Sequence, residues 1–268
     1  MKNSYFWAAL FILTLVNCRK TLSVNDRPMI DTEAFHNRNM GVSAAELLDD
    51  NIYRFLFVEI QFIAACKPEQ ATLDYLKSFL ETYLNKPKGI NIVLNEIPVI
   101  KQDALSRDEV LAIEKQKRTR FMNQDTIALY ILFTNGVHPG NKILGMAYRN
   151  TSAVIYGKAI RKYSSMAGRL THQELETAVL LHEIGHLLGL VNKGSTPISQ
   201  HIDSTFHDHC NNRKCLMFHS VETKNLSSIL LKGNIPVLDS NCIKDLIANG
   251  GKNVPDYQPF IQPFDPAY

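Results

Sequence analysis

The hydrophobic residues of this chain recur with two different periods, and their alternation predicts the order of strands and helices. Stretches rich in β-branched and aromatic residues are typical of strands, and they occur at 52–63, 90–97, 126–134, 143–148 and 153–156. Apolar residues spaced three and four apart predict helices at 68–84, 106–122 and 171–189, and a shorter helix at 239–248. Because the first helix connects two strands, we predict that these two strands are parallel.

Local signals mark where two of these helices begin and where one of them ends. Ser106 with Glu109, and Thr171 with Glu174, are capping-box pairs, in which the two side chains satisfy backbone amides of the first turn. Gly189 is expected to end the second of these helices, because glycine readily adopts a left-handed backbone. The strand at 126–134 is mostly apolar, which predicts a central place in the sheet.

These elements predict an α+β protein whose N-terminal subdomain resembles an α/β fold, with a mixed sheet and several helices. We place this subdomain at 48–191. After Gly189 the chain becomes polar and rich in histidine up to Cys215. We therefore assign 192–268 to a smaller, irregular C-terminal subdomain, which ends in a Pro-rich segment.

Composition and charge narrow the range of functions. The chain has 268 residues, which is enough for one large domain or two small subdomains, and 45% of them are hydrophobic. The net charge of +3 and the absence of a basic stripe with interleaved aromatic residues argue against a nucleic-acid partner. We expect a monomer.

The first residues are typical of an export signal. Lys2 is followed by the apolar run 5–16, which is shorter than the roughly 20 apolar residues of a membrane-spanning helix. The run ends at Cys18 in a segment that resembles a bacterial lipobox, although Asn17 replaces the usual small residue. We predict a signal at 1–18, lipid attachment at Cys18 and a flexible tether at 19–47, so that the protein is held on a membrane facing the periplasm or cell surface. A plain cleaved signal and a short anchor are the alternatives.

The remaining cysteines suit an exported protein. The four remaining cysteines are Cys66, Cys210, Cys215 and Cys242. An even number permits two disulfides, and the sequence leaves their pairing open.

The sequence HEIGH at 182–186 carries the most specific chemistry. His182 and His186 are four residues apart, so on a helix their imidazoles lie on one face and can share a zinc ion. Glu183 is placed beside the first ligand, where its carboxylate can take a proton from water that the metal activates. The motif therefore predicts one catalytic zinc site with Glu183 as general base.

A catalytic zinc ion takes three protein ligands and keeps one position open, so a third ligand is needed. The extended form of the motif has a third histidine six residues after the second, but that position is Asn192, whose neutral amide is a weak zinc donor. The polar segment that follows offers several candidates. His209 is favoured, and His207 and His201 are the alternatives.

Residues 182–189 resemble the metzincin zinc peptidases, and the pattern from His209 to Met217 is similar to the archaemetzincin branch. In that branch the third histidine is followed by Cys, four residues, Cys, one residue and Met. The resemblance implies a metzincin-like sheet, His209 as third ligand and Met217 as the Met-turn residue beneath the metal. It also implies that 192–208 is an insertion. The chain is most similar to the exported, lipoprotein kind of metzincin-type protease found in Bacteroidota.

Three further expectations come from this resemblance. Archaemetzincins complete a second, structural zinc site with a Cys-x-x-Cys pair, and only Cys242 is present here. We expect disulfides instead, as Cys210–Cys215 or a bond to Cys242, with Cys66 as the other partner. Phe218 occupies the place where some metzincins carry a catalytic Tyr. The strand before the metal helix, with Gly145, Met146 and Ala147, corresponds to the edge strand that pairs with extended substrate.

The predicted function is zinc-dependent hydrolysis of peptides or proteins. Two alternatives remain: a metallo-aminopeptidase, if the insertion closes the cleft to long substrates, and a non-catalytic lipoprotein that binds zinc as a module. Glu183 argues against the last, because a structural zinc site has four protein ligands and does not need a base.

Overall fold

The structure is a computed structural model that describes residues 32–140, 143–167, 171–221, 223 and 235–254. The predicted signal, the lipidation site Cys18 and the Pro-rich end after residue 254 lie outside these residues. Among the described residues, no helix combines the length and the apolar character that crossing a bilayer requires.

A five-stranded mixed sheet forms the centre of the fold, in the order β2-β1-β3-β5-β4. The strands are β1 (Phe55–Ile63), β2 (Ile90–Ile97), β3 (Thr126–Thr134), β4 (Gly145–Arg149) and β5 (Ser152–Tyr156). β2, β1, β3 and β5 are parallel, whereas β4 pairs with β5 in the antiparallel direction. β3 is central and almost completely buried, as its apolar sequence predicts.

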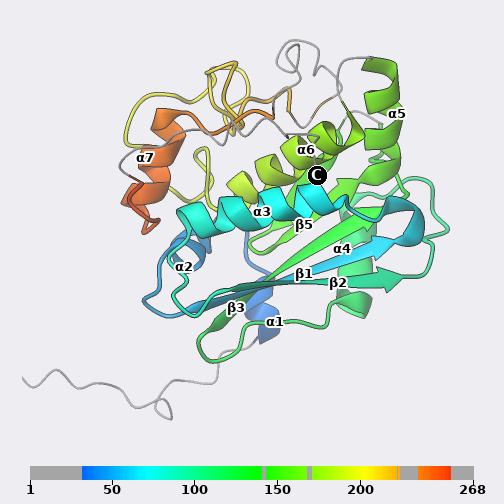
Figure 1. The fold of residues 1–268 in the computed structure, drawn as a ribbon, viewed down its shortest axis with the longest axis horizontal. Coiled ribbons are helices and arrows are strands. Elements are labelled where there is room, and N and C mark those ends of the chain that lie inside the picture. Colours follow the sequence, from blue (N-terminus) through cyan, green and yellow to red (C-terminus); the bar gives the residue numbers. More distant parts are fainter. Residues whose placement is uncertain (1–31, 141–142, 168–170, 222, 224–234, 255–268) are drawn as a thin grey trace, which may run out of the picture. The chain divides into compact units, whose positions relative to one another are not determined.

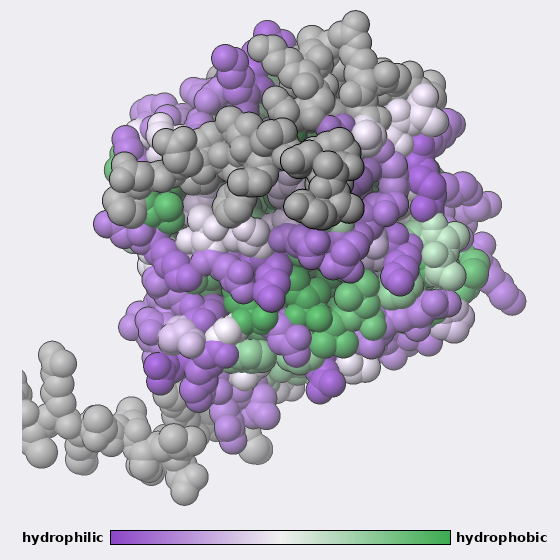
Figure 2. Space-filling model, in the orientation of Figure 1, coloured by the Kyte–Doolittle hydropathy of each residue, from purple (hydrophilic) through white to green (hydrophobic). Residues whose placement is uncertain are grey.

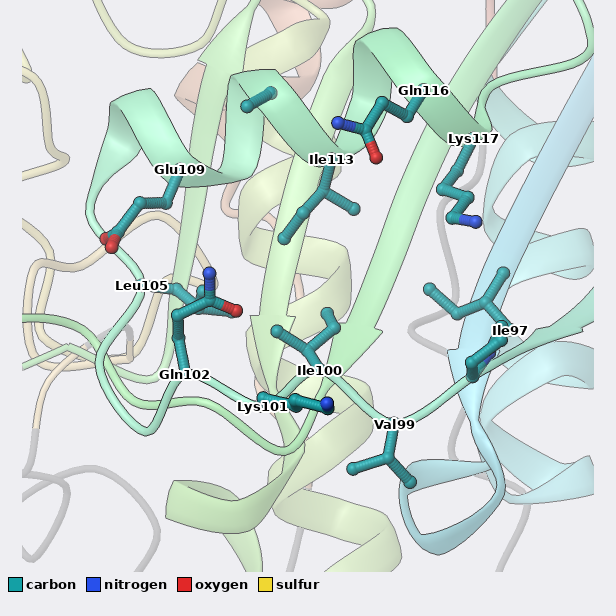
Figure 3. A pocket seen from close by; sticks show the side chains of 12 residues that line it. Ile97, Val99, Ile100, Lys101, Gln102, Leu105, Glu109, Ile113, Gln116 and Lys117 are labelled. Atoms are coloured by element: carbon teal, nitrogen blue, oxygen red, sulfur yellow. The ribbon is translucent and has the colours of Figure 1, made fainter.

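Helices cover both faces of this sheet. The α-helices of the described residues are α1 (Thr32–His36), α2 (Ala44–Leu48), α3 (Gln70–Tyr83), α4 (Arg107–Lys117), α5 (Gly157–Ala167), α6 (His172–Leu187) and α7 (Ser240–Ala248). α3 and α6 pack against each other on one face (Figure 1). α4 lies on the other face, in front of the strands in Figure 3. α3, which connects β1 to β2, and α4, which connects β2 to β3, therefore bury apolar side chains on opposite sides of the sheet.

The predicted α+β class, the parallel pair β1–β2 and the mixed sheet are confirmed. Both capping boxes form, at Ser106 and at Thr171. Three helices were not predicted: α1, α2 and α5. α4 ends at Lys117, earlier than expected, because the backbone of Arg118 is not helical (φ −60°, ψ 130°). Its guanidinium group is buried, where it pairs with Glu114 and donates a hydrogen bond to the Ala128 carbonyl.

The prediction of a flexible tether up to residue 47 is wrong from Thr32 onward. Phe35 and Leu47 are buried in the main core. The imidazole of His36 shares a hydrogen bond of 2.7 Å with Thr151 and accepts one of 3.0 Å from the Met122 amide. Burial and the neighbouring Arg118 lower the pKa of His36 to about 2, so its neutral ring is part of this packing. Its helices α1 and α2 have five residues each, which is too short for a periodic pattern of apolar residues to be recognised in the sequence.

The edge strand β2 keeps part of its apolar surface exposed. Ile90, Ile92 and Leu94 are only partly buried against the core. Figure 2 shows hydrophobic side chains gathered over the region of β1 and β2.

We expect Leu47→Ala to lower the free energy of unfolding by about 2–5 kcal/mol, because it removes a fully buried side chain. Val42→Ala, at a nearby position that is 55% exposed, should change it by less than about 0.5 kcal/mol. Denaturant unfolding of the two variants measures this difference. Equal, small effects would mean that the segment is not packed in solution.

Candidate metal centre

α6 brings the HEIGH motif into the interior. The helix begins at Thr171, whose hydroxyl accepts a hydrogen bond from the Glu174 amide. From Leu175 to Leu187 every residue of the helix is buried, between α3 and α5 on one side and β4 and β5 on the other. Gly189 ends the helix as predicted, because its backbone adopts the left-handed conformation (φ +84°). Only glycine fits there, since a side chain would collide with Ser195.

Backbone carbonyl groups fix the orientation of both histidines of the motif. His182 Nδ1 lies 2.7 Å from the Leu216 carbonyl oxygen, and His186 Nδ1 lies 2.9 Å from that of Leu190. A carbonyl only accepts, so each Nδ1 carries the proton and each Nε2 presents a lone pair. The two Nε2 atoms are 3.1 Å apart.

His209 completes a group of three imidazoles. One ring nitrogen from each of His182, His186 and His209 lies within 4.8 Å of the others. The other two candidates for third ligand are elsewhere: His207 is exposed, and His201 belongs to a separate cluster. The two ends of the insertion lie close together, because Lys193 and Asp208 form an ion pair of 2.5 Å, and His209 follows Asp208 directly.

The donor set fits a zinc ion. Two nitrogens bound to zinc at tetrahedral angles lie about 3.3 Å apart, given Zn–N bonds of roughly 2.0–2.1 Å. The observed separation of His182 Nε2 and His186 Nε2 is 3.1 Å. Burial and the neighbouring His209 lower the pKa of His186 to about 3, which keeps its lone pair available for a metal. Three imidazoles are the protein ligand set of one kind of open, catalytic zinc site.

Glu183 lies against the edge strand β4. Its Oε2 accepts a hydrogen bond of 2.6 Å from the Ala147 amide, and the residue is fully buried. Gly145 makes this contact possible, because a Cβ there would lie 2.8 Å from Glu183 Oε1. The structure thus places the predicted edge strand, with Gly145, Met146 and Ala147, beside the predicted base. The Ala147 amide orients the carboxylate.

Met217 lies under the metal helix. A Cβ on Gly185, between the two histidines of the motif, would come within 2.3 Å of Met217 Sδ. The glycine therefore allows the turn that contains Met217 to approach the helix closely. The same turn presents the Leu216 carbonyl to His182, so the turn both supports and orients the first ligand.

The predicted disulfides are wrong: all four described cysteines are free. Cys66 lies at the end of β1, where its Sγ accepts a hydrogen bond of 2.9 Å from Arg161. The other three converge in a second cluster. Cys215 Sγ and Cys242 Sγ are 3.6 Å apart, and the donor atom of Cys210 lies within 4.8 Å of that of Cys242.

His201, from the insertion, faces this cysteine cluster. Its Nδ1 lies 3.9 Å from Cys242 Sγ, and its Nε2 is 2.7 Å from a carboxylate oxygen of Asp245. A carboxylate that holds one imidazole nitrogen while the other faces a metal is the usual arrangement around zinc-bound histidine. The donor atoms that all lie within 4.8 Å of one another belong to His201, Cys210, Cys242 and Asp239, and Cys215 adjoins this group through Cys242. Asp239 Oδ1 caps α7 by accepting hydrogen bonds from the Asn241 and Cys242 amides, and Asp239 Oδ2 accepts one of 3.3 Å from the Cys210 thiol.

The charges of this cluster also suit a metal. Hydrogen bonds within the cluster lower the pKa of the Cys215 thiol and raise the pKa of the Cys210 and Cys242 thiols, so the cluster favours one thiolate, on Cys215. A bound cation would stabilise the other two thiolates. Two sulfurs bound to one zinc ion lie about 3.8 Å apart, given Zn–S bonds of roughly 2.3 Å. Three thiol groups and one imidazole are a closed, structural donor set.

A pocket of about 430 Å³ lies apart from both clusters. It is formed by α4 and the segment after β2, with apolar groups such as Ile100 and Ile113 facing Lys101 and Gln116 (Figure 3). None of the predicted site residues lines it.

No protein-family model and no curated protein matches this sequence. Among solved structures, the chain is similar to the crystal structure of an archaemetzincin from Methanopyrus kandleri. The TM-score is 0.48 at 16% sequence identity, over 73% of this chain and 95% of that one.

Two features of the site were missed from the sequence. The first is the cysteine cluster with His201 and Asp245, whose residues are spread over more than 40 positions and share no fixed spacing. The second is the Ala147 amide that orients Glu183, because a backbone contact between a strand and a helix leaves no residue pattern. Three free cysteines in one C-terminal region were the available signal.

We expect His209→Ala to bind about one zinc ion fewer per chain than the parent, because two imidazoles alone do not retain a catalytic zinc ion. His207→Ala is the matched control, two positions away and exposed, and should retain the full zinc content. Elemental analysis after dialysis measures both. Loss of zinc from the His207 variant in place of the His209 variant would contradict the assignment.

Proposed function

We propose that this chain is a zinc-dependent peptidase that hydrolyses peptide bonds of peptides or proteins. The observation that carries the proposal is the buried carboxylate of Glu183 on the same turn of α6 as two oriented imidazoles, with His209 completing the ligand set. A binding site for zinc alone would not need this carboxylate.

His182, His186 and His209 would hold the metal. When bound there, zinc supplies Lewis acidity, which lowers the pKa of water and polarises a carbonyl group. Glu183, held by the Ala147 amide, accepts the proton of the attacking water and passes it to the leaving amine. The outer edge of β4 provides backbone groups that can pair with an extended peptide. The full burial of Glu183 strengthens its electrostatic interactions.

We also propose that a second zinc ion binds to Cys210, Cys215, Cys242 and His201. This cluster has four protein ligands, so its role is structural. His209 precedes Cys210 directly, and Leu216 follows Cys215 directly. The second ion would therefore hold in place both the third ligand and the carbonyl that orients His182.

The alternative functions are separated by simple substrates. A metallo-aminopeptidase would require a free N-terminus, so peptides with a blocked N-terminus distinguish it from an endopeptidase.

For the location, the sequence of residues 1–18 supports our proposal of an exported protein attached to a membrane by lipid at Cys18. Mass spectrometry of the mature N-terminus tests it.

Glu183→Gln should lower kcat/KM by about 10²–10⁴-fold, because it removes the proton acceptor without changing size. Its zinc content should equal that of the parent. Glu81→Gln makes the same chemical change at an exposed position of α3 and should leave activity unchanged. Hydrolysis of a mixed peptide pool by the full-length, zinc-loaded chain, read by mass spectrometry, measures these effects. Equal activity of parent and Glu183→Gln would contradict the role of Glu183.

The parent should contain about two zinc ions per chain, and Cys242→Ser about one, because the cluster loses one of its thiolate ligands. Cys66→Ser is the matched control and should keep both ions, since Cys66 does not belong to the cluster. Elemental analysis with thiol titration checks this. One zinc ion in the parent, together with a disulfide among these cysteines, would contradict the second site.

A further inference from the structure

Phe206 is a large aromatic side chain held at the surface beside the metal ligands. It is 44% exposed, and its ring centroid lies 6.4 Å from that of His209. A single exposed apolar residue is common on proteins and needs no explanation. The position of Phe206 beside the candidate third ligand, and the way it is held there, distinguish it.

A closed turn fixes the backbone of Phe206. Asp203 Oδ1 accepts hydrogen bonds from the amides of Thr205 and Phe206, at 2.8 and 2.9 Å. The Phe206 carbonyl in turn accepts one of 2.8 Å from the His209 amide. The Asp203 amide donates to the His209 carbonyl at 2.8 Å. The same turn therefore positions both His209 and Phe206 beside the site.

Ring stacking holds the side chain of Phe206. Phe206 stacks on His219, with ring centroids 3.9 Å apart and ring planes inclined by 17°. His219 in turn contacts Phe218, with centroids 4.2 Å apart. Phe218 is buried, His219 is partly exposed and Phe206 is the most exposed. We call these three residues the aromatic stack. It runs from the Met217 turn to the surface and joins this turn to the insertion.

We propose that Phe206, supported by His219, is a specificity-determining residue that binds an aromatic or large apolar substrate side chain next to the scissile peptide bond. The proposal rests on the peptidase function above. A rigid exposed ring offers apolar contact area, and it loses little conformational freedom on binding because the stack already orders it. An apolar substrate side chain that covers the ring also removes it from water.

Ile198 provides a matched control on the same insertion. It is 59% exposed, so it is as accessible as Phe206. Its amide donates a hydrogen bond of 2.8 Å to Asp245, the residue that holds His201. It therefore belongs to the side of the loop that faces the cysteine cluster, whereas Phe206 lies beside His209.

The experiment uses the full-length, zinc-loaded chain, Phe206→Ala and Ile198→Ala. A mixed peptide pool first identifies the residues preferred around the cleaved bond. Peptide pairs that differ only in Phe or Ala at the preferred position then give kcat/KM. We expect the parent to favour Phe over Ala by about ten-fold or more. Phe206→Ala should reduce this ratio to within about two-fold of unity, with the Ala peptide cleaved at the parental rate and zinc content unchanged. Ile198→Ala should behave as the parent.

Three results would overturn the subsite. They are a ratio that persists in Phe206→Ala, an equal loss for both peptides, and loss of zinc from that variant, which would make the role of Phe206 structural. Each of them leaves the peptidase function intact if the parent cleaves. No cleavage by the zinc-loaded parent is a different outcome, which removes the proposed function and the subsite with it.

Discussion

The hydrogen bonds from two imidazoles to backbone carbonyl groups are the interaction on which the site depends. His182 donates to Leu216 and His186 to Leu190, each through Nδ1. With those protons fixed, two Nε2 lone pairs face one another at 3.1 Å. Two lone pairs this close repel each other unless a cation, such as a metal ion or a proton, lies between them. The backbone of two loops therefore prepares a candidate metal site before the third ligand is considered.

The two carbonyl groups come from segments that the rest of the fold must place. Leu190 follows the helix end at Gly189 directly. Leu216 lies between Cys215 and Met217, so its position depends on the cysteine cluster below and on the contact between Met217 and Gly185 above. The insertion enters both clusters, with His201 in one and His209 in the other. Short stretches of chain therefore link the histidine cluster to the cysteine cluster, since His209 precedes Cys210 and Leu216 follows Cys215.

The sequence predicts much of this fold because its signals are local. β2 and β3 have the bounds that their hydrophobic runs predict, and the capping boxes begin α4 and α6 at the expected residues. Local signals fail for short segments whose order comes from distant contacts. α1 and α2 are an example, since His36 is ordered by Thr151 and Met122, far along the chain.

The same distinction applies to the site. His182, Glu183 and His186 share one helix turn, and their spacing alone predicts that they lie together. The choice among His209, His207 and His201 depends on how an inserted loop folds, which no spacing encodes. The cysteines were paired incorrectly because cysteine number suggests disulfides equally well as a metal cluster. The free state of the described cysteines and the approach of His201, which Asp245 holds, to the Cys242 thiol distinguish the two.

The most direct test is a crystal structure of the zinc-loaded chain with anomalous data collected at the zinc edge. We expect an anomalous peak about 2.0–2.1 Å from Nε2 of His182, Nε2 of His186 and one nitrogen of His209, with no fourth protein ligand. If the peak beside His182 and His186 were coordinated by His207 or His201 in place of His209, or by a fourth protein ligand, it would contradict an open catalytic site.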